Sequence, residues 1–422
     1  MIRTAVLFLI LILFSQVTIA QREPNYDESK VPEFKLPDPL KTFTGKKVRN
    51  VKQWEKKRRP ELLEFFTQNM YGEIPGKLPI HSVDILEQSP DAFNGKAIRK
   101  QIELTFQKNN RSLAFTILMY LPKGVEKAPV FLGYNFFGNH TVVDDVNVII
   151  SEAWVPDYPS FGIVHNQLTE QSRGVRTDRW AVEKMLDAGF GFATIYYGEV
   201  DPDKDEYSDG VQSLFYIDDQ LKPADDEWGS VAAWAWGLSR ALDYLEQDKD
   251  VDASRVVVFG HSRLGKTSLW AGASDQRFAG VISNNSGCGG AALSKRQFGE
   301  TVYTINKNFP HWFCGNFKNY SNNELSMPVD QHEVIALIAP RPVYIASAKD
   351  DRWADPRGEY LSAYYASPVY NLYGKAGLTS IEMPDTNRPV INVVAYHIRS
   401  GGHDVTDFDW QQYINWATIF IK

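Results

Sequence analysis

Residues 255–265 have the sequence RVVVFGHSRLG. A β-branched apolar run leads directly into a turn flanked by Gly260 and Gly265, and a helical pattern begins immediately after Ser262. Glycines suit such a turn because the helix must pack close to the strand that precedes it. The segment therefore predicts a buried strand, a tight turn that exposes a serine hydroxyl, and a helix. A helix-capping serine in an ordinary strand-loop-helix turn is the simpler alternative.

Outward from this segment, short and wholly apolar runs alternate with helical ones. The strand candidates are 191–197, 255–259, 279–283, 342–347 and 389–396, and the helices between them include 228–246, 263–273 and 355–366. Solid apolar strands that alternate with helices indicate a parallel sheet covered on both faces. A serine in the turn after such a strand is the nucleophile position of an α/β-hydrolase. We therefore expect a three-layer αβα sandwich.

The N-terminal half of the chain has a different pattern. Runs at 80–86, 97–106 and 112–120 carry polar residues between apolar ones, as half-exposed antiparallel strands do, and 128–134 is a further strand candidate. We expect a mostly parallel central sheet with antiparallel N-terminal strands. A helical stretch over 51–70 precedes them, and residues 21–50, polar and proline-containing, are expected to form an extended strap. Without an internal repeat or a long linker, residues 51–422 are expected to be a single catalytic domain.

The first twenty residues differ from the rest of the chain. Arg3 precedes an apolar run over 5–14, and the small-residue sequence at 18–20 resembles a cleavage site. The apolar run is shorter than the roughly 20 residues of a membrane span. The sequence predicts a signal peptide over 1–20, no membrane span, and export to the periplasm or the medium.

The composition of the 422 residues, with 43% hydrophobic and 23% charged side chains, is that of a folded globular protein. A net charge of -7 argues against electrostatic binding to nucleic acid or anionic membranes. Cys288 and Cys314 are the two cysteines. In an exported chain they are a disulfide candidate, with two buried thiols as the alternative. They lack further ligands at suitable spacing, so no metal is expected.

An α/β-hydrolase places its catalytic residues in the order serine, acid, histidine. Four histidines follow Ser262, namely His311, His332, His397 and His403. His403 lies in the glycine loop SGGHD after the last predicted strand, where a base must lie to reach the serine. We therefore expect His403 to be the general base.

The loop KDDRWADP, after the strand candidate 342–347, contains Asp350, Asp351 and Asp355. A carboxylate there orients the imidazole and stabilises the imidazolium. The other possible location, after 279–283, holds Asn285, which cannot take the charged role. The spacing alone does not decide whether Asp350 or Asp351 is the catalytic acid.

Two parts of the sequence are candidates to supply hydrogen-bond donors to the oxyanion hole. The backbone N–H of Arg263 follows the nucleophile and is the expected first donor, and its guanidinium is a second candidate. The loop at 135–140, NFFGNH, has the position of the usual further contributor but lacks a GG pair.

Several motifs resemble those of the glucuronoyl esterases, carbohydrate esterase family fifteen, and of its bacterial members more than the fungal ones. The strand-to-helix turn GHSRLGK, residues 260–266, is called the elbow below and is similar to the family's G-x-S-R-x-G-K. In this pattern the second glycine follows the serine by three positions, whereas in the usual G-x-S-x-G it follows by two. Further similar segments are RRPELLEFFTQNMYGEIP, NFFGNHT, SRGVRTDRW, SGCGGAA, FGETV, FPHWFCGNF, APRPVYIASAKDDRWADP and SGGHD. They cover most of the chain from about residue 45 onward.

The resemblance implies roles for individual residues. Ser262 would be the nucleophile, His403 the base, and Arg263 part of the oxyanion hole. Lys266, Glu300 and Trp353 match the family residues that contact the uronic acid ring. Among the aspartates the resemblance favours Asp351. The sugar-binding glutamine of fungal members has no match that we can place.

These roles imply a serine esterase that cleaves the ester between 4-O-methyl-D-glucuronic acid of glucuronoxylan and a lignin alcohol, without a cofactor. We expect the protein to be a monomer, although the sequence does not give its oligomeric state. An acetyl xylan or feruloyl-type esterase is the first alternative, and a non-catalytic carbohydrate-binding relative is the second. The segment 141–179, with Trp154, Tyr158 and Phe161, is expected to form a wall on the alcohol side.

Overall fold

The computed structural model describes residues 23–217 and 219–422, so the signal peptide predicted over 1–20 lies outside the described residues. Its strands form one sheet in the order β1-β2-β3-β5-β4-β6-β7-β8-β9. Their bounds are β1 (Ser82–Ala92), β2 (Ala97–Lys108), β3 (Arg111–Pro122), β4 (Ala128–Asn135), β5 (Gly191–Tyr196), β6 (Val251–His261), β7 (Gly280–Asn284), β8 (Val343–Ala348) and β9 (Val394–Arg399). The pairs β1–β2, β2–β3 and β3–β5 are antiparallel. The remaining pairs, which are β5–β4, β4–β6, β6–β7, β7–β8 and β8–β9, are parallel. The predicted mixed sheet is confirmed.

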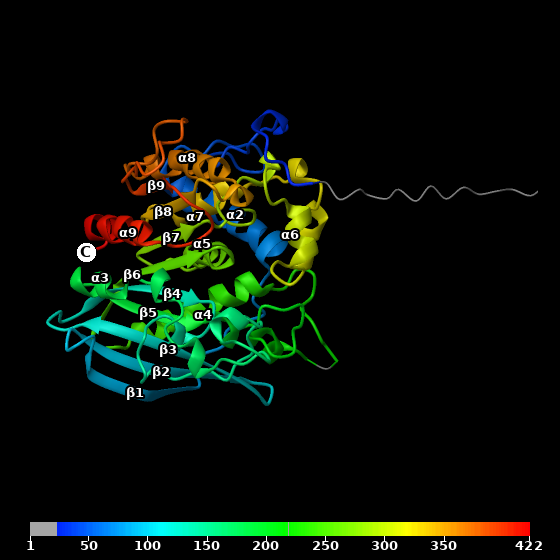
Figure 1. Ribbon diagram of the computed structural model, residues 1–422. Coiled ribbons are helices and arrows are strands. Elements are labelled where there is room, and N and C mark those ends of the chain that lie inside the picture. The colour runs from blue at the N-terminus through cyan, green and yellow to red at the C-terminus, as the bar shows by residue number, and fades with distance from the viewer. Residues whose placement is uncertain (1–22, 218) are drawn as a thin grey trace, which may run out of the picture.

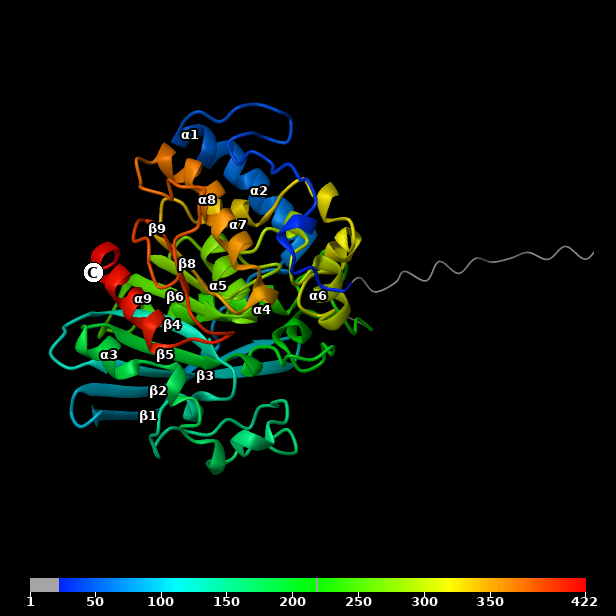
Figure 2. The same cartoon turned by 45° about the horizontal axis from the view of Figure 1, so that its top comes forward.

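Helices cover both faces of this sheet (Figures 1 and 2). They are α1 (Val51–Gln53), α2 (Arg59–Phe66), α3 (Val182–Asp187), α4 (Ser230–Leu245), α5 (Arg263–Ser274), α6 (Val302–Asn308), α7 (Gln331–Ile338), α8 (Pro356–Leu372) and α9 (Asp407–Phe420). The π-helical turn Trp54–Arg58 joins α1 to α2, and a second one, Thr67–Tyr71, follows α2, so that together they form the helical stretch expected over 51–70. One face is packed by α3 and α9, and the other by α2, α4, α5, α7 and α8.

The run of valines in β6 shows why the parallel strands are solidly apolar. Val256 and Val258 enter the core shared with α4 and α5, whereas Val257 and Phe259 enter the opposite core beside Trp410 of α9. Successive side chains of a strand point to opposite faces. Because both faces are covered by helices, every position of β6 in the middle of the sheet is buried.

The last strand begins later than the sequence predicts. The apolar run was expected to be a strand over 389–396, but β9 spans Val394–Arg399. Residues before it fold back, because Val390 exchanges hydrogen bonds of 2.8 and 3.0 Å with Tyr396 in an antiparallel bridge. Two β-branched segments therefore lie side by side where the sequence predicts one strand. The shift places the glycine loop directly at the end of β9.

The disulfide expectation is wrong. Cys288 and Cys314 are free and buried. Cys288 belongs to the main hydrophobic core, while the Cys314 Sγ faces the carbonyl oxygen of Gln68 at 3.9 Å. Burial raises the pKa of both thiols, which keeps them protonated.

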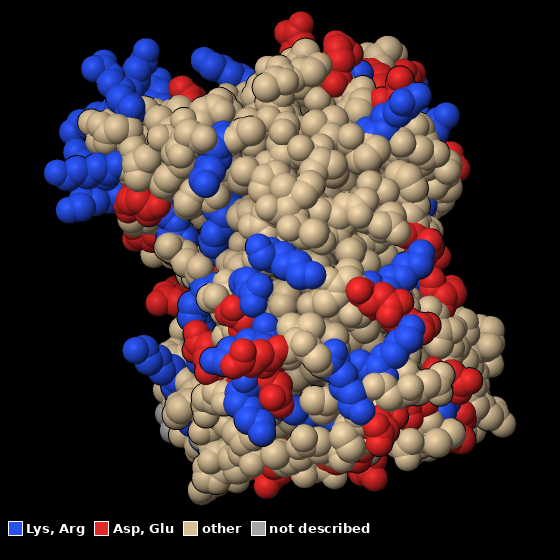
Figure 3. All heavy atoms as spheres, turned by 90° about the vertical axis from the view of Figure 1, so that its left-hand side faces the viewer, with Lys and Arg blue, Asp and Glu red and all other residues tan. Residues whose placement is uncertain are grey.

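The surface charge is uneven (Figure 3). On the face shown, lysines and arginines gather at one upper corner and a broad central area carries few charged side chains. Between residues 46 and 57 alone, six basic side chains are exposed, namely those of Lys46, Lys47, Arg49, Lys52, Lys56 and Lys57. The net charge of -7 thus coexists with a local basic patch. Across residues 23–217 and 219–422, no helix has the combined length and apolar content of a membrane span.

Candidate active site

Ser262 occupies a strained turn between β6 and α5. Its φ and ψ of 59° and -129° lie outside the regions that serine normally adopts, which costs about 1–3 kcal/mol. The turn is held because the Ser262 N–H donates to the Asn284 carbonyl oxygen at 2.9 Å. A Cβ on Gly260 would lie 1.8 Å from the Leu264 carbonyl oxygen, so glycine is required there. This geometry is the predicted nucleophile elbow.

His403 and Asp351 form a hydrogen-bonded pair. The His403 Nδ1 lies 2.6 Å from Asp351 Oδ2, which also accepts from Asn285 Nδ2 at 2.8 Å. Burial acts to raise the pKa of Asp351, but these bonds and the neighbouring imidazole outweigh it and hold the pKa below its usual range. Asp350 is exposed, and its backbone N–H donates to the Gly401 carbonyl oxygen at 3.0 Å. The geometry therefore selects Asp351 from the two aspartates that spacing left open.

A second carboxyl group, that of Glu359, lies close to this pair and differs from Asp351 in its protonation. Glu359 is fully buried and accepts hydrogen bonds from Ser347 Oγ at 2.6 Å and the Gly287 N–H at 2.9 Å. Burial raises the pKa of Glu359 to about 8. At neutral pH the protonated form predominates, so Asp351 supplies the negative charge beside the imidazole.

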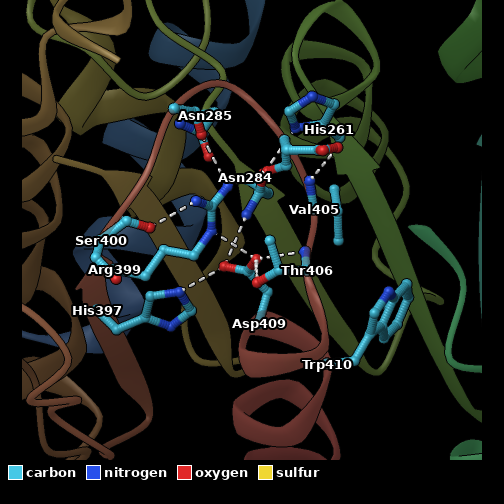
Figure 4. Close-up of polar contacts among 12 residues, drawn as sticks. His261, Asn284, Asn285, His397, Arg399, Ser400, Val405, Thr406, Asp409 and Trp410 are labelled. Atoms are coloured by element: carbon cyan, nitrogen blue, oxygen red, sulfur yellow. Dashed lines mark hydrogen bonds and ion pairs between the residues drawn. The ribbon is translucent and has the colours of Figure 1, made fainter. Parts of the chain in front are cut away.

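The loop that carries His403 is held by Arg399. The Arg399 guanidinium donates to the carbonyl oxygens of Gly402 at 3.0 Å and Asp404 at 2.6 Å, one on each side of His403 in the chain. Figure 4 shows Arg399 beside Ser400 and Asp409. The Arg399 Nε also donates to Asp409 Oδ2 at 2.7 Å, in a buried ion pair at the start of α9. His403 itself is 43% exposed, so these backbone contacts, and not burial, fix its position.

The same buried network reaches the elbow. Asn284 donates to the Tyr413 hydroxyl at 2.8 Å and lies 3.4 Å from Asp409. Its Oδ1 is 2.6 Å from Nδ1 of His261, whose ring centroid is 4.5 Å from that of His403. Burial and the neighbouring His403 hold the pKa of His261 far below its usual range, so its ring is neutral. The base and the elbow are thus positioned by one connected set of side chains.

The Arg263 guanidinium is held by Asp203. The two form an ion pair, and Asp203 Oδ1 also accepts from His311 Nε2 at 2.8 Å and Trp312 Nε1 at 2.7 Å. Burial opposes ionisation of Asp203, but Arg263 and these donors hold its pKa well below the usual range. The guanidinium carbon lies 5.6 Å from the Phe136 ring centroid and 5.0 Å from that of Trp312. Asp203 was not among the residues predicted from the sequence.

Lys266 and Glu300, predicted to contact a sugar acid, lie together near the elbow. Lys266 Nζ donates to the Ser286 and Cys288 carbonyl oxygens, both at 2.6 Å, and is 3.5 Å from Glu300 Oε2. The Glu300 N–H donates to the Trp353 carbonyl oxygen at 3.0 Å. Burial raises the pKa of Glu300 despite the attraction of Lys266. Trp353 is 37% exposed, so part of its side chain is open to solvent.

A row of aromatic rings runs outward from Arg263. Phe136 is followed by Phe137, whose ring centroid lies 5.1 Å from that of Tyr158 and 5.3 Å from that of Phe161. Tyr158 and Phe161 stack on each other at 5.2 Å, and Tyr158 is 45% exposed. The predicted wall segment therefore contributes an aromatic surface beside the elbow, while Trp154 faces Lys204 at 5.4 Å.

In the described part of the chain, no group of three or more histidine, cysteine, aspartate or glutamate side chains is arranged to hold a metal ion. The Ser262, His403 and Asp351 constellation has the parts needed for nucleophilic acyl transfer.

Comparison with known proteins agrees with this geometry. Residues 179–374 match a family model described as glucuronyl esterase, fungi. A carbohydrate esterase from an unknown prokaryotic organism is 50% identical over 93% of this chain and 91% of its own. Two solved structures are similar. A promiscuous CE15 esterase from a marine bacterial metagenome has 49% identity and a TM-score of 0.89, with 94% of this chain and 100% of that chain covered. A glucuronoyl esterase from Solibacter usitatus has 46% identity and a TM-score of 0.87, with 92% and 99% covered.

Proposed function

Because this chain belongs to carbohydrate esterase family 15, the glucuronoyl esterases, we propose that it hydrolyses esters between 4-O-methyl-D-glucuronic acid of glucuronoxylan and lignin alcohols. The observation that carries this proposal is the elbow serine beside two groups of side chains. His403 and Asp351, joined at 2.6 Å, supply acyl-transfer chemistry, and the buried Lys266 and Glu300 supply polar contacts for a sugar acid.

The reaction proceeds in two stages. Ser262 Oγ attacks the uronoyl carbonyl carbon and transfers its proton to Nε2 of His403, while Asp351 holds the Nδ1–H. The backbone N–H and guanidinium of Arg263 stabilise the oxyanion. The C–O bond to the alcohol breaks as Nε2 returns the proton to the leaving oxygen. Water, deprotonated by His403, then attacks the acyl-enzyme and releases the uronic acid and Ser262.

The direct test compares benzyl glucuronate with phenyl acetate as substrates of the mature protein. We expect kcat/KM to be much higher for the uronate, because only that substrate engages Lys266 and Glu300. One similar structure is of an esterase described as promiscuous, so phenyl acetate is an informative comparison substrate. Activity on acetate alone would favour the acetyl-esterase alternative, and activity on neither would favour a carbohydrate-binding protein.

Glu300→Gln is expected to lower kcat/KM on benzyl glucuronate about tenfold, because a charge-assisted hydrogen bond to the substrate is replaced by a neutral one. The side-chain volume is nearly unchanged. Steady-state kinetics on both esters checks this, and activity on phenyl acetate should stay constant. An equal loss on both substrates would mean that Glu300 supports the fold and does not select the sugar.

Double substitution of Tyr158 and Phe161 by alanine is expected to lower the preference for a benzyl over a methyl ester of glucuronic acid about fivefold, because the leaving aromatic alcohol loses a stacking surface. The measurement is the ratio of kcat/KM for the two esters. Val164→Ala, an exposed apolar change in the same segment, is the control. A ratio that stays the same in the double variant would rule out this wall as the alcohol site.

We further propose that the protein is exported after cleavage behind Ala20. Intact mass and N-terminal sequencing of protein from a secreting host test this: the expected first residue is Gln21, and a retained Met1 would contradict it.

A further inference from the structure

A cavity of about 1010 Å³ lies next to the proposed sugar-acid site. Its walls are the beginning of the described chain, the start of α6, and the segment 322–325. The lining includes the side chains of Tyr26, Thr301, Tyr303, Thr304, Asn322 and Asn323. Figures 1 and 2 show α6 beside the start of the described chain.

The cavity and the sugar-acid site share a wall. Thr301, in the cavity lining, directly follows Glu300, whose N–H donates to the Trp353 carbonyl oxygen at 3.0 Å. On the other side of Trp353, the Arg352 guanidinium lies 5.2 Å from the Tyr26 ring centroid. Because Thr301 adjoins Glu300 and Arg352 adjoins Trp353, the cavity is a candidate place for a sugar joined to a uronic acid held by Glu300 and Trp353.

Two consecutive buried cations hold the cavity walls in place. Lys295 Nζ donates to the carbonyl oxygens of Glu324 at 3.1 Å and Met327 at 2.6 Å, which fixes one wall. Arg296 pairs with Glu28 at 2.7 Å, which fixes the N-terminal wall. Buried charges are expensive unless they are fully paired. Here they secure irregular backbone, so the cavity is preformed and a ligand would not have to order it.

The lining has the chemistry of a site for neutral sugar. Phenol rings pack against the apolar faces of a sugar ring, and amide and hydroxyl groups hydrogen-bond its hydroxyls. The charged lining groups do not form a basic cluster, because Lys30 lies 3.7 Å from Asp27 and the other charged members are acidic. A carboxylate-bearing sugar is therefore disfavoured. Building on the proposed function, we propose that this cavity binds main-chain xylose residues next to the branch point of glucuronoxylan.

Tyr303→Ala tests this subsite, and Tyr364→Ala is the control, because Tyr364 is a similarly half-buried tyrosine that lies on α8 and outside the cavity lining. We measure kcat/KM on methyl 4-O-methylglucuronate and on the same ester linked to xylotriose. Tyr303→Ala should lower the value for the oligosaccharide ester by about tenfold relative to the small ester. Tyr364→Ala should change neither value. An equal loss on both esters, or no loss, overturns the subsite.

Binding of unesterified, neutral xylotetraose gives a readout that does not depend on esterase activity. In the Ser262→Ala background, titration calorimetry should detect binding that Tyr303→Ala weakens by about tenfold. If the wild-type protein hydrolysed neither ester but still bound xylotetraose through Tyr303, the subsite would stand and the proposed function would fail. If it hydrolysed both esters but bound no xylotetraose, the subsite would fail and the function would stand.

Discussion

Ser262→Ala should lower kcat on benzyl glucuronate by about a millionfold, because the covalent route disappears and only binding and the oxyanion hole remain. The residue lies in the strained turn between β6 and α5, and alanine has no hydroxyl to act as the nucleophile. Steady-state kinetics with high enzyme concentration measures the loss. Product binding, measured by calorimetry, should be retained.

The double variant Ser262→Ala/His403→Ala is the matched control. Residues that act as one catalytic unit are strongly non-additive, so the second substitution should cost little further activity. Thermal unfolding should stay close to wild type, because His403 is 43% exposed. Activity of Ser262→Ala within a hundredfold of wild type would contradict the serine mechanism.

Asp351→Asn should lower kcat by about 10⁴-fold, the second-largest effect that we expect. The substitution preserves size but removes the charge from the atom that lies 2.6 Å from His403 Nδ1. The neutral amide then neither stabilises the imidazolium nor fixes the same tautomer. The measurement is kcat on benzyl glucuronate at saturating substrate.

The adjacent residue offers an unusually close control. Asp350→Asn removes the same charge one residue away, at an exposed position whose backbone N–H contacts the Gly401 carbonyl oxygen at 3.0 Å. Its kcat should remain within about twofold of wild type, as for a surface substitution away from special contacts. Equal losses in the two variants would show that local charge, and not the geometry of Asp351, is what matters.

The fold was predictable where burial of a strand produces a simple pattern of apolar residues in the sequence. In β6, helices on both faces leave a solid apolar run, and the glycine at 260 marks the turn. The start of β9 was misplaced because Val390 pairs back onto Tyr396, and two apolar segments that lie side by side look like one strand in the sequence.

In the site, the order of residues along the chain pointed to Ser262 and His403 through the elbow and the glycine loop. The order of residues did not distinguish Asp350 from Asp351, because adjacent residues of a loop can differ in burial: Asp350 is exposed and Asp351 is buried. The supporting residues Asp203, Arg399 and Asp409 were missed. Their contacts join distant segments, as when Asp203 meets His311, 108 residues away. The position of Asp203 after β5, at the carboxyl edge of the sheet, was the signal available.

The two buried thiols have a practical consequence. Cys288 and Cys314 are held apart in the core and beside the π-helical turn, and their raised pKa values leave them unreactive toward oxidants and mixed disulfides. Because no disulfide has to form, folding needs no disulfide oxidase or disulfide isomerase. The enzyme should reach the same native state in a reducing cytoplasm as in an oxidising culture medium, so it can be produced without export and used in the presence of the thiols and phenolic reductants that accompany plant biomass.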